Sequence, residues 1–118
     1  MKIIELKKNF GNFAIDIEDW HIERGQMHAV IGPNGCGKTA AAKLIMDMIK
    51  PDVSDIDFEG VSRRDITMAP QKPYMLHDSV YNNLVYPLKV RGIKPDRAAA
   101  DAWLETCGLL DMKKQYAP

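Results

Sequence analysis

The sequence has few cysteines and no long apolar run. Only two of its 118 residues are cysteines, Cys36 and Cys107. Two cysteines do not build a disulfide framework, and this usage is typical of a reducing compartment. No stretch approaches the roughly 18 consecutive apolar residues of a membrane-spanning helix, so we expect no direct membrane insertion. Glu5 stands where a signal peptide would keep its apolar core, so we expect no export signal.

The chain also lacks an excess of charge of either sign. Lysine and arginine together number 16, as do aspartate and glutamate, so the formal net charge is zero. A generic nucleic-acid binder carries a basic excess, and we therefore expect no nucleic-acid partner. Hydrophobic residues make up 46% and charged residues 27%, as in folded globular proteins. Composition thus predicts a small folded domain without indicating its chemistry.

Periodicity predicts alternating strands and helices. Residues 13–23 alternate apolar and polar side chains, as in a strand with one wet face. The Arg24–Gly25 turn predicts that residues 26–31 pair back as a hairpin partner, and the apolar run 29–31 is typical of a strand covered on both faces. We expect strands at 3–6, 13–23, 26–31, 55–58 and 65–69. We expect helices at 38–49 (largely buried and ended by Pro51), from a cap at Asp78 or Ser79 to 90 (kinked at Pro87), and at 96–107, closed by Gly108.

One segment carries recognisable chemistry. Residues 32–39 match the pattern G-x-x-x-x-G-K-[ST] in full. Glycine lets consecutive backbone N–H groups turn inward around a polyphosphate, and the following helix N-terminus favours an anion. Lys38 would reach the β- and γ-phosphates, and the hydroxyl of Thr39 would bind the bridging Mg²⁺. The expected nucleotide contacts are Gly32, Pro33, Asn34, Gly35, Cys36, Gly37, Lys38, Thr39 and Ala40. The simpler alternative is an ordinary glycine turn between a strand and a helix.

Four further segments occur in a fixed order around this loop. Residues 22–26 read IERGQ, and residues 51–60 run from Pro-Asp to Phe-Glu-Gly. Residues 66–71 end in Pro-Gln, and residues 79–84 read SVYNNL. Together with the loop they resemble the ATP-binding cassette ATPases, the nucleotide-binding subunits of ABC transporters. Asp55 departs from that family's pattern, which usually has glycine or glutamate there.

The resemblance implies roles for individual residues. Phe10 would stack on adenine, with Phe13 as the competing candidate. Gln71, like Lys38, would belong to the catalytic residues, and Gln71 would join Thr39 at the Mg²⁺. Residues 74–83 would lie where the family receives its transmembrane partner, although Tyr74, Met75 and Leu76 are equally compatible with a buried core.

The resemblance also implies an architecture and partners. It predicts an incomplete α/β P-loop NTPase fold with an N-terminal antiparallel β hairpin region and the start of a helical subdomain. Residues 1–77 would form part of the ATP-binding core, and residues 78–118 would begin the helical subdomain. The expected ligands are ATP and Mg²⁺. The expected protein partners are a second ATPase subunit, identical or different, and a transmembrane permease subunit that holds the protein peripherally on the cytoplasmic face of the membrane.

Several of the family's motifs are not found in these 118 residues. The Leu-Ser-Gly-Gly-Gln signature and the acidic Walker B strand are among them. Because phosphoryl transfer to water needs a completed metal site and a positioned water, we expect the isolated chain to bind nucleotide weakly and to hydrolyse it negligibly. Two alternatives remain: another P-loop enzyme, such as a small-molecule kinase, or a non-catalytic fragment acting as an interaction module.

Overall fold

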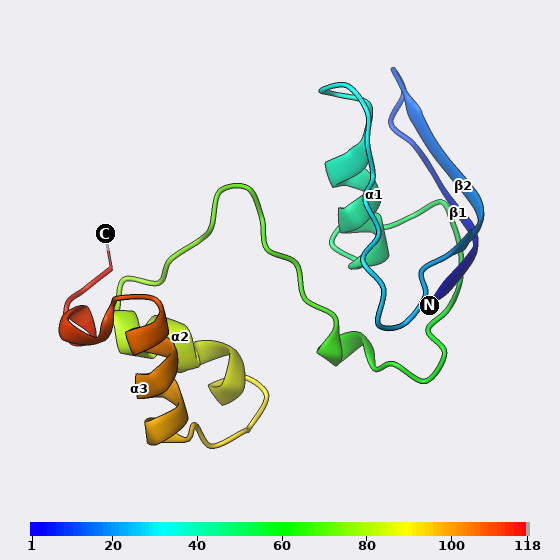
Figure 1. Cartoon of the computed structure of the whole chain (residues 1–118). Coiled ribbons are helices and arrows are strands. Elements are labelled where there is room, and N and C mark those ends of the chain that lie inside the picture. Colours follow the sequence, from blue (N-terminus) through cyan, green and yellow to red (C-terminus); the bar gives the residue numbers. More distant parts are fainter. Residues whose placement is uncertain (118) are drawn as a thin grey trace. The chain divides into compact units, whose positions relative to one another are not determined.

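The computed structural model describes residues 1–117, which form two compact units, residues 1–69 and residues 70–117. The first unit contains the three strands and the first helix (Figure 1), and the second contains two further helices. No helix of the described residues is both long enough and apolar enough to span a bilayer. The predicted division at 77/78 lies inside the second unit and remains a prediction about function.

A three-stranded antiparallel sheet forms the framework of the first unit. Its strands are β1 (Lys2–Asn9), β2 (Ala14–His21) and β3 (Val53–Asp57), arranged in the order β2-β1-β3. The central strand β1 pairs through Leu6 with Ile17 of β2 and with Ser54 of β3. The expected hairpin region is therefore present, but β2 pairs with the strand before it rather than with residues 26–31.

An irregularity in β1 determines which side chains enter the core. The register of β1 against β3 shifts between Ile3 and Glu5, which is a β-bulge. Strict alternation would place Ile3 and Glu5 on one face. The extra residue instead lets Ile3 and Leu6 share the face that packs with Ile15 and Leu44 in the buried core.

A second irregularity lies in β2. Asp19 has a positive φ of 50°, a conformation that non-glycine residues rarely adopt. Beyond it, Trp20 packs against the core cluster instead of Asp19. The alternation that predicts the strand therefore fails at this end of β2.

Helix α1 (Lys38–Ile45) is shorter and less buried than expected. The backbone N–H of Asp47 donates to the carbonyl of Leu44 (3.1 Å) and that of Met48 to the carbonyl of Lys43 (2.9 Å), with Asp47 at φ 59°. This is the Schellman pattern, formed here without glycine, and it ends the helix before Pro51 is reached. Leu44 is the helix's one fully buried side chain, so the prediction of a largely buried helix is wrong.

Two expected strands are not formed in the described residues. Residues 26–31 and 66–69 have no strand pairing, and residues 63–65 form a short 3₁₀ helix (Arg63–Asp65). A strand is stable only where a neighbour accepts its backbone hydrogen bonds, and no segment of residues 1–117 pairs with either stretch. The apolar side chains of Met27 and Ile31 are consequently 99% and 93% exposed.

Hydrogen bonds and an ion pair link the two strands at the end of the sheet where β1 ends and β3 begins. Asp52, just before β3, accepts from the backbone N–H of Asn9 (2.8 Å) and from Lys8 Nζ (3.0 Å). The Asn9 N–H and the Lys8 ammonium hold the pKa of the Asp52 carboxyl below its ordinary value. These bonds join the end of β1 to the start of β3.

The second unit follows the sequence-based prediction closely. Helix α2 (Val80–Lys89) begins after Ser79, whose hydroxyl accepts from the N–H of Asn82 (3.1 Å), so Ser79 rather than Asp78 is the cap. Helix α3 (Arg97–Thr106) begins after Asp96, which accepts from the N–H of Ala98 (3.0 Å). Gly108 ends it with φ 68°. A 3₁₀ helix (Leu110–Met112) follows.

Asn83 ties the segment before α2 to that helix. Its Oδ1 accepts from the N–H of Leu76 (2.8 Å), and its Nδ2 donates to the carbonyl of Leu76 (3.0 Å). The same Nδ2 also reaches the carbonyls of Asp78 and Ser79. One amide side chain therefore joins the backbone of Leu76, Asp78 and Ser79 to the first turn of α2.

Two neighbouring isoleucines of β1 test this description of the core. Ile3 is fully buried, whereas Ile4 at the bulge is 40% exposed. We expect Ile3→Ala to lower the free energy of unfolding by about 2–4 kcal/mol and Ile4→Ala by less than about 1 kcal/mol. Urea unfolding followed by the fluorescence of Trp20, with Trp103 replaced by Phe in every variant, measures both. Equal losses would contradict the bulged register.

Candidate functional site

The glycine-rich loop of residues 32–37 adopts a shape that only its glycines allow. Gly35 and Gly37 have φ of 81° and 99°, in the left-handed region that side chains disfavour. Within residues 1–117, Cys36 is the one loop residue whose N–H donates to a protein carbonyl, that of Pro33 at 3.3 Å. The remaining N–H groups of the loop are available to a ligand.

The loop leads directly into the N-terminus of α1. Gly37 is the N-cap, and no side chain caps the helix. The first helical bond runs from the N–H of Ala41 to the carbonyl of Gly37 (2.8 Å), so the N–H groups of Lys38, Thr39 and Ala40 have no acceptor among the described residues. Such orphan donors, together with the positive end of the helix dipole, favour an anion.

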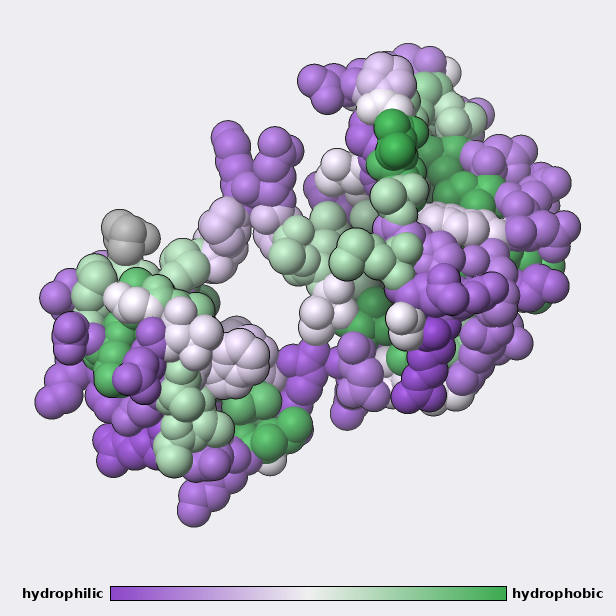
Figure 2. Space-filling model, in the orientation of Figure 1, coloured by the Kyte–Doolittle hydropathy of each residue, from purple (hydrophilic) through white to green (hydrophobic). Residues whose placement is uncertain are grey.

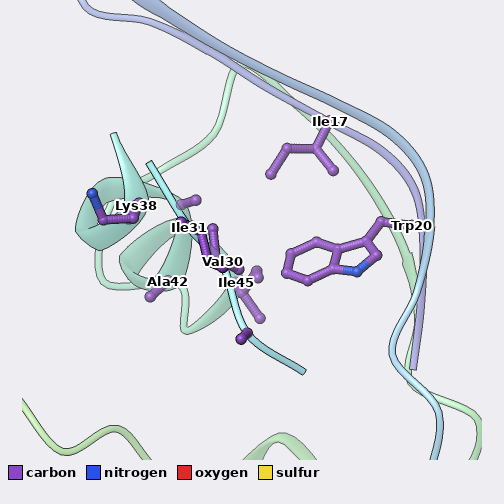
Figure 3. A pocket seen from close by; sticks show the side chains of 9 residues that line it. Ile17, Trp20, Val30, Ile31, Lys38, Ala42 and Ile45 are labelled. Atoms are coloured by element: carbon purple, nitrogen blue, oxygen red, sulfur yellow. The ribbon is translucent and has the colours of Figure 1, made fainter. Parts of the chain in front are cut away.

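Lys38 places its charge on this loop. Its Nζ donates to the carbonyls of Gly32 (2.7 Å) and Pro33 (2.8 Å) and lies 3.6 Å from Cys36 Sγ. Figure 3 shows the amino group pointing away from the Trp20 ring. The ammonium therefore sits on the same loop that offers the free N–H groups.

Thr39 supplies an exposed hydroxyl at the first turn of α1. Its Oγ1 makes no hydrogen bond to any residue from 1 to 117, and the described residues contain no cluster of three His, Cys, Asp or Glu side chains able to hold a metal. Mg²⁺ usually keeps several waters and takes one or two protein oxygens besides substrate phosphates. The donor set here fits that kind of binding, in which most ligands come from the nucleotide and water.

Gly32 lies so close to the side chain of Cys36 that a larger residue would not fit without a shift. A Cβ there would lie 2.7 Å from Cys36 Sγ. A contact this short forces one of the two residues to move. Gly32 thus allows the thiol of Cys36 and the ammonium of Lys38 to pack over the start of the loop.

The two candidate adenine-stacking residues lie together beside the loop. The rings of Phe10 and Phe13 stack with their centroids 4.6 Å apart and an angle of 7° between their planes. A Cβ at Gly37 would come within 3.5 Å of Phe13 Cε2 and 3.4 Å of Ile15 Cδ1. Sequence reasoning missed Ile15 as a support of the loop, since nothing in its strand pattern indicates that contact.

Gln71 belongs to the second unit and is exposed. Its expected contact with Mg²⁺ remains a prediction.

An apolar pocket of about 470 Å³ lies on the other side of α1 from the Lys38 amino group (Figure 3). Ile17 and Trp20 of β2 reach towards the helix and the segment before the loop. The side chains of its lining are apolar apart from the Lys38 amino group and the indole N–H of Trp20. In the sequence, the apolar run of residues 29–31 is the part of this pocket's lining that stands out. The full lining is Ile17, Trp20, Ala29, Val30, Ile31, Lys38, Ala41, Ala42 and Ile45.

This loop and helix junction defines the class of P-loop nucleotide-binding proteins. The family model described as "ABC transporter" matches residues 16–118. The chain therefore belongs to the ABC transporter ATP-binding family and has its P-loop NTPase fold, of which the small antiparallel sheet and the helices are a part. The resemblance drawn from the sequence motifs is confirmed, and the reading as another P-loop enzyme is not supported.

Curated relatives give the same family. The chain is 38% identical to the tungstate uptake system ATP-binding protein TupC of Peptoclostridium acidaminophilum, over 76% of this chain and 44% of that protein. It is 29% identical to the probable iron export ATP-binding protein FetA of Escherichia coli, over 88% and 52%. It is 32% identical to the Fe(3+) ions import ATP-binding protein FbpC of Vibrio cholerae, over 92% and 34%. The chain spans about half the length of the first two relatives.

A pair of substitutions tests the packing at the loop. Gly32→Ala places a methyl group against Cys36 Sγ, which must rotate out of contact with Lys38 Nζ, and we expect about three- to fivefold weaker binding of ATP. Cys36→Ala removes the sulfur, so the double variant is expected to bind ATP as Cys36→Ala alone does. Isothermal titration of the three variants measures this. A double variant as weak as Gly32→Ala would contradict the contact.

Proposed function

We propose that this chain binds ATP together with Mg²⁺ at the loop of residues 32–39, as part of the ATP-binding subunit of a transporter. One observation carries the proposal: N–H groups without protein acceptors at the junction of the loop and α1 share that loop with the Lys38 ammonium. Membership in the ABC transporter family supports ATP as the nucleotide.

Different groups of the site would bind different parts of the nucleotide and its metal ion. Backbone N–H groups of the loop and of Lys38, Thr39 and Ala40 surround the phosphates, and the Lys38 side chain neutralises their outer charge. Its present acceptors are carbonyl oxygens, which a phosphate oxygen replaces with a charge-assisted bond. Thr39, with Gln71 as the proposed second protein ligand, would hold the Mg²⁺, which screens the phosphate charge when bound.

The activity of the whole protein is a further step of the same proposal. The relatives are named as ATP-binding proteins of tungstate uptake, of Fe(3+) ion import and of probable iron export. We therefore propose a transport ATPase that works with a second ATPase subunit and a transmembrane permease, without choosing a solute. The signature and Walker B motifs are not in these 118 residues. These residues alone are accordingly proposed to hydrolyse ATP negligibly.

Substitutions in α1 test the binding site. We expect Lys38→Ala to weaken ATP binding at least tenfold with or without Mg²⁺, because a direct charge contact is lost. Thr39→Ala is expected to weaken it only when Mg²⁺ is present. Lys43→Ala, a lysine of the last turn of the same helix, is the matched control and should bind as the unmodified chain does. Equal affinities of the Lys38 and Lys43 variants, or no ATP binding at all, would favour the interaction-module alternative.

The aromatic pair can be tested separately from the phosphate site. A ring that stacks on adenine contributes to ATP binding but not to the binding of inorganic tripolyphosphate. We expect loss of the Phe10–Phe13 stack, by Phe10→Ala or Phe13→Ala, to weaken ATP binding about five- to tenfold or more. Tripolyphosphate affinity should stay unchanged, and the larger loss identifies the stacking residue. Equal losses for both ligands would show that the rings only support the loop.

A further inference from the structure

Asn34, in the glycine-rich loop, differs from the other asparagines of the chain. It is the one asparagine of the five that glycine follows. The side chains of Asn9, Asn82 and Asn83 all take part in hydrogen bonds. The side chain of Asn34 makes none with the described residues, and Asn34 and Gly35 are both exposed. The Asn34 amide is therefore free to rotate and open to water.

Asn34 and Gly35 are the central residues of a turn in this loop. One long hydrogen bond closes the turn, from the N–H of Cys36 to the carbonyl of Pro33 at 3.3 Å. A Cβ built on Gly35 would meet no other atom within 4 Å. Hydrophilic atoms project at the end of the first unit where Figure 1 draws the loop in cyan (Figure 2). Little in the described residues therefore holds the turn in one conformation.

The backbone nitrogen of Gly35 is placed to attack the side-chain carbon of Asn34. The two atoms belong to adjacent residues, so a bond between them closes a small ring. The nitrogen must lose its proton, and the N–H of Gly35 has no acceptor among the described residues. Glycine also lacks the Cβ that hinders this approach in other residues. The positive end of the α1 dipole and the Lys38 ammonium on the same loop favour the anion that forms.

We propose that Asn34 is a site of spontaneous deamidation that lowers the affinity of the loop for ATP. In the first step, Gly35 N bonds to Asn34 Cγ, and Asn34 Nδ2 leaves as ammonia with the proton that the backbone nitrogen gave up. In the second step, a solvent water adds to one of the two carbonyls of the ring imide and opens it. The product is an aspartate or an isoaspartate, and either one carries a carboxylate that the amide lacked. Water is the one co-reactant, and nothing is oxidised or reduced.

The new carboxylate would lie in the loop that the proposed function assigns to phosphate. It repels phosphate and competes for the neighbouring N–H groups and for Lys38. Isoaspartate also lengthens the backbone before Gly35, which moves the donors of the loop. A bound triphosphate, in turn, would engage the N–H of Gly35 and hold the turn, so it would slow the attack. The effects on and of ATP rest on the proposed function, whereas the chemical step does not.

Peptide mapping of the complete 118-residue chain, incubated without nucleotide at mildly alkaline pH, tests the chemical step. Trypsin releases Asn34 within residues 25–38, and mass spectrometry locates the change from amide to acid. Asn12 is the internal control, because it is exposed and makes no side-chain hydrogen bond with the described residues, but precedes Phe13. We expect Asn34 to convert roughly tenfold or more faster than Asn12, and faster as the pH rises. Conversion no faster than that of Asn12 would overturn the proposal.

Titration of the converted chain tests the effect on binding. Anion exchange isolates it by its additional negative charge, and circular dichroism checks that it is folded. We expect it to bind ATP about tenfold more weakly than the unconverted fraction, and Asn34→Asp to bind ATP more weakly as well. Asn34→Gln requires a larger ring, so its affinity, whatever the starting value, should stay constant while that of the unmodified chain falls. Equal affinities of the two fractions, or an equal fall in Asn34→Gln, would overturn this part of the proposal.

The conversion rate measured with ATP and Mg²⁺ tests the protection. We expect saturating ATP to slow conversion at Asn34 about tenfold or more, and the same concentration to protect the Lys38→Ala chain less. Equal rates with and without ATP, in a chain that binds ATP, would overturn the protective role. A chain that converts at Asn34 but never binds ATP would contradict the proposed function and leave the modification site standing.

Discussion

The structure of the first unit depends on the junction at Gly37. This residue ends the loop in a left-handed conformation and lies so close to Ile15 and Phe13 that a Cβ would touch both. Ile15 belongs to the same core as Leu44 near the other end of α1. The sheet therefore holds the helix by its buried residue and by its first turn. With the helix held in this way, its N-terminal donors stay together on one loop, available to a phosphate.

Local signals predicted the elements that carry their own caps. The starts of α2 and α3 follow from Ser79 and Asp96, and the end of α3 follows from Gly108, because each interaction lies within a few residues in sequence. The glycine-rich loop could also be predicted, because the spacing of its glycines indicates the backbone conformation that it adopts. The Schellman turn at Asp47 could not be predicted, because aspartate rarely occupies the left-handed C′ position, which is usually glycine.

Features that depend on distant partners could not be predicted. The segment 26–31 has the composition of a buried strand, yet nothing in residues 1–117 pairs with it, so its apolar side chains stay exposed. The bulge near Ile4 depends on β3, some fifty residues away, and it changes which side chains reach the core. Zero net charge likewise concealed the local positive charge of Lys38 at the glycine-rich loop. Averages over the chain do not report where charges lie.

The central claim is that backbone N–H groups of the loop and the first turn of α1 bind the phosphates of ATP. Titration of the ¹⁵N-labelled chain with ATP and Mg²⁺, followed by amide NMR, tests it most directly. The account predicts that the largest shift changes fall on residues 34–40, Pro33 having no amide hydrogen, and that tripolyphosphate reproduces them. Changes confined to other residues, or no change at saturating ATP, would contradict it.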